Sequence, residues 1–198
     1  MKKTICLAGG CFWGMEKLFR SLPGVLDVTV GYANGTIDDP QEYADYRSVC
    51  SGMTGFREAA MISYDDEKIS LKKLLFAFYA VIDPTVENRQ GMDFGSQYQT
   101  GIYWTDPADA SAIAAVTAVE KAAIEAGGTN YYRDDDAFCV ETGPLVNFFP
   151  AEEYHQRYLE KRPGGYCHIS PSRIKNIIAF DYKDEKYTKA AQKLLRVW

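Results

Sequence analysis

In the first third of the chain, the apolar positions follow two patterns, one typical of strands and one typical of a helix. Residues 3–8 and 25–30 are short apolar runs typical of strands, and residues 12–20 carry apolar side chains at helical spacing. Pro23-Gly24 separates that helix from the second strand. Residues 31–55 are rich in Gly, Asn, Asp, Ser and Tyr, so they predict a long loop with a turn of helix, followed by a strand over 58–64.

The remaining pattern predicts three more helices and two more strands. Ser70 is placed to cap a helix that reaches Ile82, and Asp106-Pro107 begins the longest helix, which ends at Gly127-Gly128. Residues 101–104 and 138–140 predict strands, and residues 151–161 predict a helix. Two stretches, residues 83–99 and the mixed-charge C-terminal segment, are predicted to be irregular.

These elements predict an α+β fold. Strands and helices alternate, but several connections are too irregular for repeated βαβ units, so we expect a two-layer sandwich whose mixed, mainly antiparallel sheet is flanked by helices, as in a ferredoxin-like plait. A doubly wound parallel sheet is the alternative. The segment from Gly9 to Gly14 lacks the Gly-x-Gly-x-x-Gly order of dinucleotide sites, and no phosphate-binding Gly-Lys-Ser/Thr sequence occurs.

Composition and charge narrow the class of protein further. The 198 residues are 46% apolar, enough to bury a core without disulfides or a structural metal. Both signs of charge are scattered along a chain of net charge −5, which makes nucleic acid an unexpected partner. Apolar stretches fall short of the ~20 residues that cross a bilayer, and no cleavable leader pattern follows Met1, so we expect a cytoplasmic protein without a membrane partner.

Five cysteines in a reducing compartment predict thiol chemistry. They are Cys6, Cys11, Cys50, Cys139 and Cys167, and none forms a Cys-x-x-Cys pair. Only two histidines accompany them, so no metal site is expected. Cys6 and Cys139 lie in predicted strands and are interpreted as buried apolar fillers.

Cys11 lies where a predicted strand meets a predicted helix. The positive end of a helix and its unpaired N–H groups stabilise a thiolate there, an effect that lowers the pKa only modestly. Gly9 and Gly10 permit a close approach of other groups, and Phe12 and Trp13 can frame a small apolar group. The alternative is that Cys11 only fills space between the two elements.

Two family resemblances involve this cysteine. Cys11 and Trp13, with His155 and Asn176 downstream, resemble a papain-like cysteine protease, but the Cys-Gly-Ser-Cys-Trp segment and the glutamine before it are absent. The chain more fully resembles the type A peptide methionine sulfoxide reductases. The matching segments, in family order, are Gly10-Cys11-Phe12-Trp13-Gly14, Gly31-Tyr32, Tyr46-Arg47-Ser48-Val49-Cys50-Ser51-Gly52, Thr54-Gly55 with Glu58, Asp93-Phe94-Gly95-Ser96-Gln97-Tyr98, Ala151-Glu152-Glu153-Tyr154-His155-Gln156 and Gly165-Tyr166-Cys167.

This second resemblance implies a role for each matched residue. Cys11 would attack the sulfoxide sulfur, and Glu58 would be the acid, provided that burial raises its pKa and Arg57 turns away. The other implied residues are Phe12 and Trp13 around the substrate methyl group, Tyr46 and Tyr98 on the sulfoxide oxygen, and Asp93 ordering the site. Without the resemblance, Glu58 reads as an exposed strand-edge residue, Asp93 as a loop cap and each tyrosine as core packing. His155 is expected to order backbone.

The resemblance also implies how the nucleophile is recycled. Cys11 sulfenic acid would condense with Cys167, on a mobile Pro-Gly-Gly segment, and thioredoxin would reduce the resulting disulfide. Cys50 remains an alternative resolving thiol. The implied enzyme is a monomer that uses no metal or organic cofactor and reduces methionine S-sulfoxide, free or in proteins. The alternative function is a thiol sensor without turnover.

The resemblance divides the chain into two parts. Residues 1–168 hold all the matched motifs and form the expected catalytic domain. Residues 169–198 lie outside them, and parts of this tail resemble the connector of fused type A and type B reductases. Its role is open. Many family members carry His where Phe94 stands in this chain.

Overall fold

A six-stranded sheet organises the protein. The structure is a computed structural model that describes residues 1–126 and 137–194. The strand order is β7-β6-β1-β3-β2-β8, and every neighbouring pair is antiparallel except β6 and β7, which are parallel. The bounds are β1 Lys2–Ala8, β2 Val25–Ala33, β3 Arg57–Asp65, β6 Gly101–Trp104, β7 Glu141–Pro144 and β8 Phe148–Pro150. The predicted α+β class and the mixed, mainly antiparallel sheet are confirmed.

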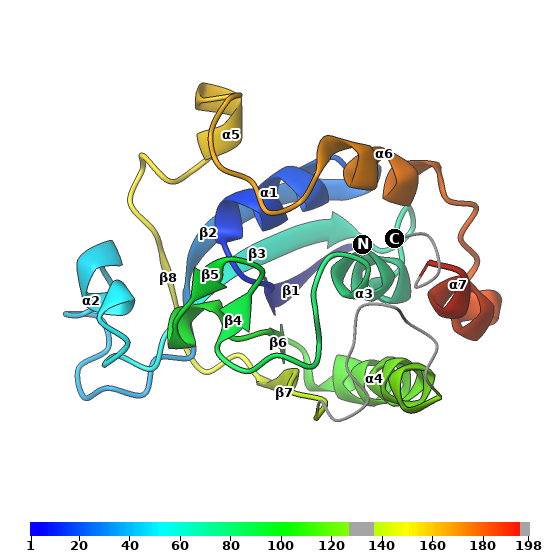
Figure 1. Cartoon of the computed structure of the whole chain (residues 1–198), viewed down its shortest axis with the longest axis horizontal. Coiled ribbons are helices and arrows are strands. Elements are labelled where there is room, and N and C mark those ends of the chain that lie inside the picture. The colour runs from blue at the N-terminus through cyan, green and yellow to red at the C-terminus, as the bar shows by residue number, and fades with distance from the viewer. Residues whose placement is uncertain (127–136, 195–198) are drawn as a thin grey trace.

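Helices cover one face of this sheet (Figure 1). Alternate residues of β1 point to opposite faces: Ile5 and Leu7 join the main core with α1 (Phe12–Arg20) and α3 (Leu71–Tyr79). Cys6 and Ala8 form a second cluster with Leu145 and the β8 residue Phe148. Ser70 caps α3 by accepting a hydrogen bond from the Lys73 N–H, as predicted. Within the described residues, no helix combines the length and apolarity that crossing a membrane requires.

The two irregular segments contain short regular elements. The first holds α2 (Tyr46–Cys50), the predicted turn of helix, which Asp45 caps. The second, predicted without regular structure, forms a hairpin of β4 (Arg89–Gln90) and β5 (Asp93–Phe94), followed by the 3₁₀ turn η1 (Ser96–Tyr98). Figure 1 shows α2 on one side of the molecule and α7 on the other. The strands of the hairpin are too short to carry a period-2 pattern, which is why the sequence does not reveal them.

The predicted helix over 151–161 is wrong over most of its length. Only α5 (Tyr158–Lys161) is helical, and Arg157 before it has a left-handed φ of 52°. The Gln156 side chain instead pairs with the β2 edge, accepting from the Val30 N–H and donating to the Val30 carbonyl. Glu152 accepts from the Tyr46 N–H. These tertiary hydrogen bonds hold the segment in turns despite its helical pattern.

Two further boundaries differ from the prediction. Residues 138–140 are not a strand, and the strand begins at β7 instead. Asp106 caps the 3₁₀ turn η2 (Pro107–Asp109), after which α4 runs over Ala110–Glu125. The predicted stop at Gly127-Gly128 lies outside the described residues.

The C-terminal segment was predicted to be irregular, and this is also wrong. It forms α6 (Pro171–Ala179), the turn η3 (Asp184–Lys186) and α7 (Tyr187–Leu194). Ile174, Ile177 and Tyr187 join the main core. The Tyr187 hydroxyl donates to Glu120 of α4 at 2.5 Å, and Lys73 of α3 donates to the Ile177 carbonyl at 3.2 Å. The segment therefore completes the core beside α3 and α4.

This packing predicts a stability effect that is specific to one face of α6. Ile177 is fully buried, whereas the next residue, Ile178, is 40% exposed. Ile177→Ala should lower the free energy of unfolding by about 2–4 kcal/mol, because it leaves a cavity in the core. Ile178→Ala is the matched control and should change it by less than ~1 kcal/mol. Urea unfolding measures both, and equal effects would show that α6 is not anchored through Ile177.

Candidate active site

Cys11 is the N-cap residue of α1 and is almost fully buried. The backbone N–H groups of Trp13 and Gly14 lower the pKa of its thiol and so favour the thiolate. Gly10, directly before it, has a φ of 82°, and a Cβ at that position would lie 2.6 Å from Gln90. Glycine is therefore required for the chain to deliver the thiol to the start of the helix.

Glu58 of β3 lies beside the nucleophile. It is 1% exposed, and its Oε2 accepts a hydrogen bond from the Phe12 N–H at 3.1 Å. Burial, helped by the charge of Asp93, raises the pKa of Glu58 to about 8. Arg57 turns away and pairs with Glu141 at 2.8 Å. Glu58 is therefore a neutral acid at neutral pH, and the exposed strand-edge alternative is wrong.

The resting form of Cys11 is a thiol. Burial and the nearby Glu58 carboxylate raise its pKa, while the helix-start N–H groups lower it. The modestly lowered pKa that the helix start predicted is therefore wrong: the N–H groups do act in that direction, but burial dominates. The two acids also oppose each other's ionisation, so they titrate as a pair.

Two phenol groups face this pair. Tyr46 comes from α2 and Tyr98 from η1, and for both, burial and the charges of Glu58 and Cys11 raise the pKa. Both hydroxyls therefore stay protonated and able to donate hydrogen bonds. Tyr46 also bonds the Cys50 thiol, and this places Cys50 next to the site although it is exposed.

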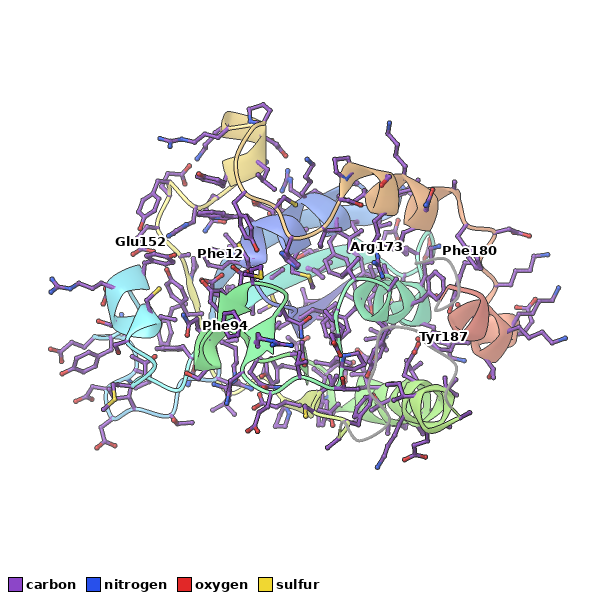
Figure 2. All side chains as sticks on the ribbon, in the orientation of Figure 1. Phe12, Phe94, Glu152, Arg173, Phe180 and Tyr187 are labelled. Carbon is purple, nitrogen blue, oxygen red and sulfur yellow. The ribbon has the colours of Figure 1, made fainter. Side chains whose placement is uncertain are left out.

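Aromatic rings from α1 and from residues 154–158 build one wall of the site. The Trp13 indole N–H donates to His155 Nδ1 at 3.0 Å, and the Trp13 ring stacks on Tyr158 at 3.7 Å. The His155 ring also contacts Phe12 at 5.1 Å and Tyr46 at 4.6 Å. Figure 2 shows Phe12, Phe94 and Glu152 in the same half of the molecule. His155 therefore orders side chains, not backbone as predicted.

Glu152 connects two parts of this wall. Its carboxylate accepts from the Tyr32 hydroxyl at 2.7 Å and from the Tyr46 N–H at 2.9 Å. These hydrogen bonds hold the pKa of Glu152 below its usual range. Tyr158, Tyr166 and Glu152 are site residues to which sequence reasoning gave no role. Glu152 and Tyr166 stood inside matched motifs, and that was the signal available.

Asp93 is joined by a hydrogen bond to Tyr166, which directly precedes Cys167. Asp93 of β5 accepts a hydrogen bond from the Tyr166 hydroxyl at 3.0 Å. Burial, the hydrogen bond to Asp93 and nearby charges raise the pKa of Tyr166 to about 12. The Cys167 thiol donates to the Ile169 carbonyl at 3.0 Å and is free, as is Cys11.

Cys6, Cys139 and Asn176 take no part in the contacts around Cys11 described above. Cys6 is fully buried in the sheet, as predicted, but Cys139 is half-buried in a loop, where its N–H donates to the Pro84 carbonyl. Asn176 lies on α6, and no hydrogen bond joins Cys11 to His155 in the described part of the chain. The protease arrangement is therefore not formed. Residues 1–126 and 137–194 contain no cluster of three or more His, Cys, Asp or Glu placed to hold a metal.

The buried Cys11 thiol beside a protonated carboxyl suits thiol-dependent redox chemistry, which is the class of enzyme to which the comparisons with known proteins also point. The family model for peptide methionine sulfoxide reductase matches residues 3–187. Peptide methionine sulfoxide reductase MsrA of Clostridium acetobutylicum is 45% identical over 173 residues, covering 87% of this chain and 98% of the relative. The chain belongs to the peptide methionine sulfoxide reductase family and is an oxidoreductase.

Solved structures of this family share the fold. Methionine sulfoxide reductase A of Corynebacterium diphtheriae aligns with a TM-score of 0.74 at 33% identity, covering 84% of this chain and 77% of that one. Reduced Mxr1 of Saccharomyces cerevisiae aligns with a TM-score of 0.72 at 38% identity, covering 84% and 88%. Mxr1 has also been solved in complex with Trx2; that structure aligns with a TM-score of 0.50 at 27% identity, covering 79% of this chain and 84% of that one.

Proposed function

We propose that the chain reduces methionine S-sulfoxide with Cys11 as nucleophile and Glu58 as acid. The observation that carries this assignment is the buried, protonated Glu58 carboxyl held on the Phe12 N–H, one residue from the thiol. Reduction of a sulfoxide requires a proton at the departing oxygen, and a carboxyl can supply it near neutral pH only when its pKa is raised.

In the reactive form, Cys11 and Glu58 carry one proton in total: Cys11 is a thiolate and Glu58 is protonated. The thiolate attacks the sulfoxide sulfur while Glu58 protonates the oxygen, which gives an intermediate with an S–S bond between Cys11 and the substrate. The hydroxyl group then moves to the Cys11 sulfur, as this S–S bond and the S–O bond of the substrate break. Cys11 ends as a sulfenic acid, oxidised by two electrons, and the substrate as a thioether, reduced by two. Glu58 ends as a carboxylate.

Substrate recognition follows from the groups around this pair. The Tyr46 and Tyr98 hydroxyls can donate to the sulfoxide oxygen, and their hydrogen bonds strengthen as that oxygen gains charge. Phe12 and Trp13 would receive the methyl group, because methyl–sulfur groups pack well on aromatic rings. Asp93 orders the site through Tyr166.

Recycling requires a second thiol. We assign it to Cys167: its thiol attacks the Cys11 sulfenic acid, a Cys11–Cys167 disulfide forms, and the oxygen leaves as water with the thiol proton. Cys167 is partly exposed, so thioredoxin would reach the disulfide and reduce it. The complex of Mxr1 with Trx2 supports this choice of reductant.

Cys167→Ser tests this assignment. The variant should form about one methionine per chain and then stop with thioredoxin, while dithiothreitol restores turnover, because a small dithiol can reduce the sulfenic acid directly. Cys50→Ser is the parallel variant, since Cys50 lies beside Tyr46. It should turn over with thioredoxin as the wild type does. The opposite pattern would make Cys50 the resolving thiol.

The function itself is tested with the two separated epimers of a blocked methionine sulfoxide and dithiothreitol. The wild type should reduce the S epimer only, and methionine is quantified by chromatography. Reduction of the R epimer would contradict the proposed stereochemistry. No reduction of either epimer, with a sulfenic acid still formed by peroxide, would instead favour the thiol sensor.

Four broader assignments accompany the function. We propose a two-layer ferredoxin-like plait, supported by the order β6-β1-β3-β2 with α1 and α3 as crossovers. We propose residues 1–168 as the catalytic part, which contains every site residue above, with residues 169–194 supporting its core. We also propose that the enzyme acts on free or protein-bound methionine sulfoxide. Finally, we propose that it works as a cytoplasmic monomer without nucleic-acid or membrane partners, consistent with its scattered charge.

A further inference from the structure

His168, the residue after Cys167, packs directly on the start of α1. A Cβ at Gly14 would lie 2.8 Å from its Cε1 and 2.9 Å from its Nδ1, and a Cβ at Gly10 would lie 3.7 Å from its Nε2. These two glycines stand on either side of Cys11 in the sequence. The ring can occupy this position because Gly14 has no side chain, since a Cβ there would overlap it.

Shape holds this ring in place. Both ring nitrogens are buried, and neither makes a hydrogen bond of normal geometry in the described part of the chain, although the ring interacts with the Gly9 carbonyl. Burial lowers the pKa of His168, and it outweighs the charge of Asp93 and the Gly9 carbonyl, which favour the protonated ring. The imidazole is therefore neutral, and its contact with the glycines is van der Waals packing.

The surroundings of His168 leave room for it to move. A cavity of about 370 Å³ borders the ring, and its walls include Val86, Gln90, Gly91 and Arg173. The Cys167 thiol is bonded to the Ile169 carbonyl in this reduced form. Forming a bond to Cys11 breaks this hydrogen bond, because the Cys167 sulfur then carries no proton.

We propose that His168 is the positioning residue for the resolving step. Its ring on Gly10 and Gly14 keeps Cys167 beside the nucleophile, and it moves into the adjacent cavity as the Cys11–Cys167 disulfide forms. The inference rests on the proposed function, because it takes Cys167 as the resolving thiol. It gives His168 no part in reducing the substrate.

Peroxide provides a test that does not depend on sulfoxide reduction. Hydrogen peroxide converts the Cys11 thiol to sulfenic acid and is itself reduced to water, after which the same resolving step follows. Rapid alkylation and mass spectrometry then give the rate of Cys11–Cys167 disulfide formation in the full chain. His168→Ala should slow this rate by about tenfold or more, since the thiol is no longer positioned. His168→Phe keeps a ring and should stay within about threefold of the wild type.

Two further measurements separate positioning from a structural defect. The amount of methionine formed in a single turnover with S-sulfoxide should equal that of the wild type in both variants. Val86→Phe should fill the cavity and also slow the disulfide step. Disulfide formation at the wild-type rate in His168→Ala would overturn the inference, and so would a Phe variant as slow as the Ala variant. Failure of the wild type to reduce sulfoxide, with a normal peroxide result, would count against the proposed function alone.

Discussion

Cys11→Ser should abolish methionine formation from S-sulfoxide, with any reductant and in a single turnover. A serine side chain has no sulfur and so cannot form a sulfenic acid. Its hydroxyl also has a pKa far above that of a thiol, so it is a poor nucleophile. The wild type without reductant should yield about one methionine per chain, and the variant none above background. Chromatography of the quenched reaction measures both.

Cys139→Ser is the matched control for this loss. Cys139 is half-buried in a loop outside the site, and its backbone N–H donates to the Pro84 carbonyl. This variant should form methionine at the wild-type rate. Stoichiometric methionine from Cys11→Ser would exclude Cys11 as the nucleophile, whatever the reductant.

Local patterns predicted the elements that lie next to Cys11 well. The strand, the helix start and the two glycines before the thiol follow from short-range preferences, and the structure places them as expected. The helix predicted around His155 is wrong, because the Gln156 side chain forms hydrogen bonds with the β2 edge and Glu152 accepts one from the Tyr46 N–H across the fold. Such long-range hydrogen bonds leave no periodic trace in the sequence.

The C-terminal segment shows a second limit of pattern reading. Its helices are short and carry few apolar residues, so their mixed charge predicted an irregular tail. Ile174 and Ile177 lie on one side of α6 and are buried against the main core. Packing against α3 and α4 supplies the stabilisation that the weak pattern did not predict.

The candidate site, like the fold, was predicted from the sequence only in part. Motif matches named Cys11, Glu58 and the two phenols, and the structure brings these groups together. The direction in which the pKa of Cys11 shifts depends on burial, which the sequence does not give. The roles of Tyr158 and Tyr166 depended on contacts with Trp13 and Asp93 across the fold.

Glu58→Gln should lower kcat/KM for S-sulfoxide by about a hundredfold or more at pH 8, because the proton donor is lost. The pH dependence identifies the cause. In the wild type, the form with one proton shared by Cys11 and Glu58 replaces the doubly protonated form near pH 8. The rate should therefore rise up to about pH 8 and then level off. In the Gln variant, the rate should rise through pH 8 without levelling, since only the thiol titrates.

Stability provides the control for this variant. The pKa of Glu58 is raised in the folded state, so its contribution to stability is present at low pH and is lost as pH rises toward about 8. Gln carries no charge at any pH. Relative to the wild type, the variant should therefore gain stability between about pH 5 and pH 9, measured by urea unfolding. A folded variant that keeps wild-type turnover and still levels near pH 8 would show that another group donates the proton.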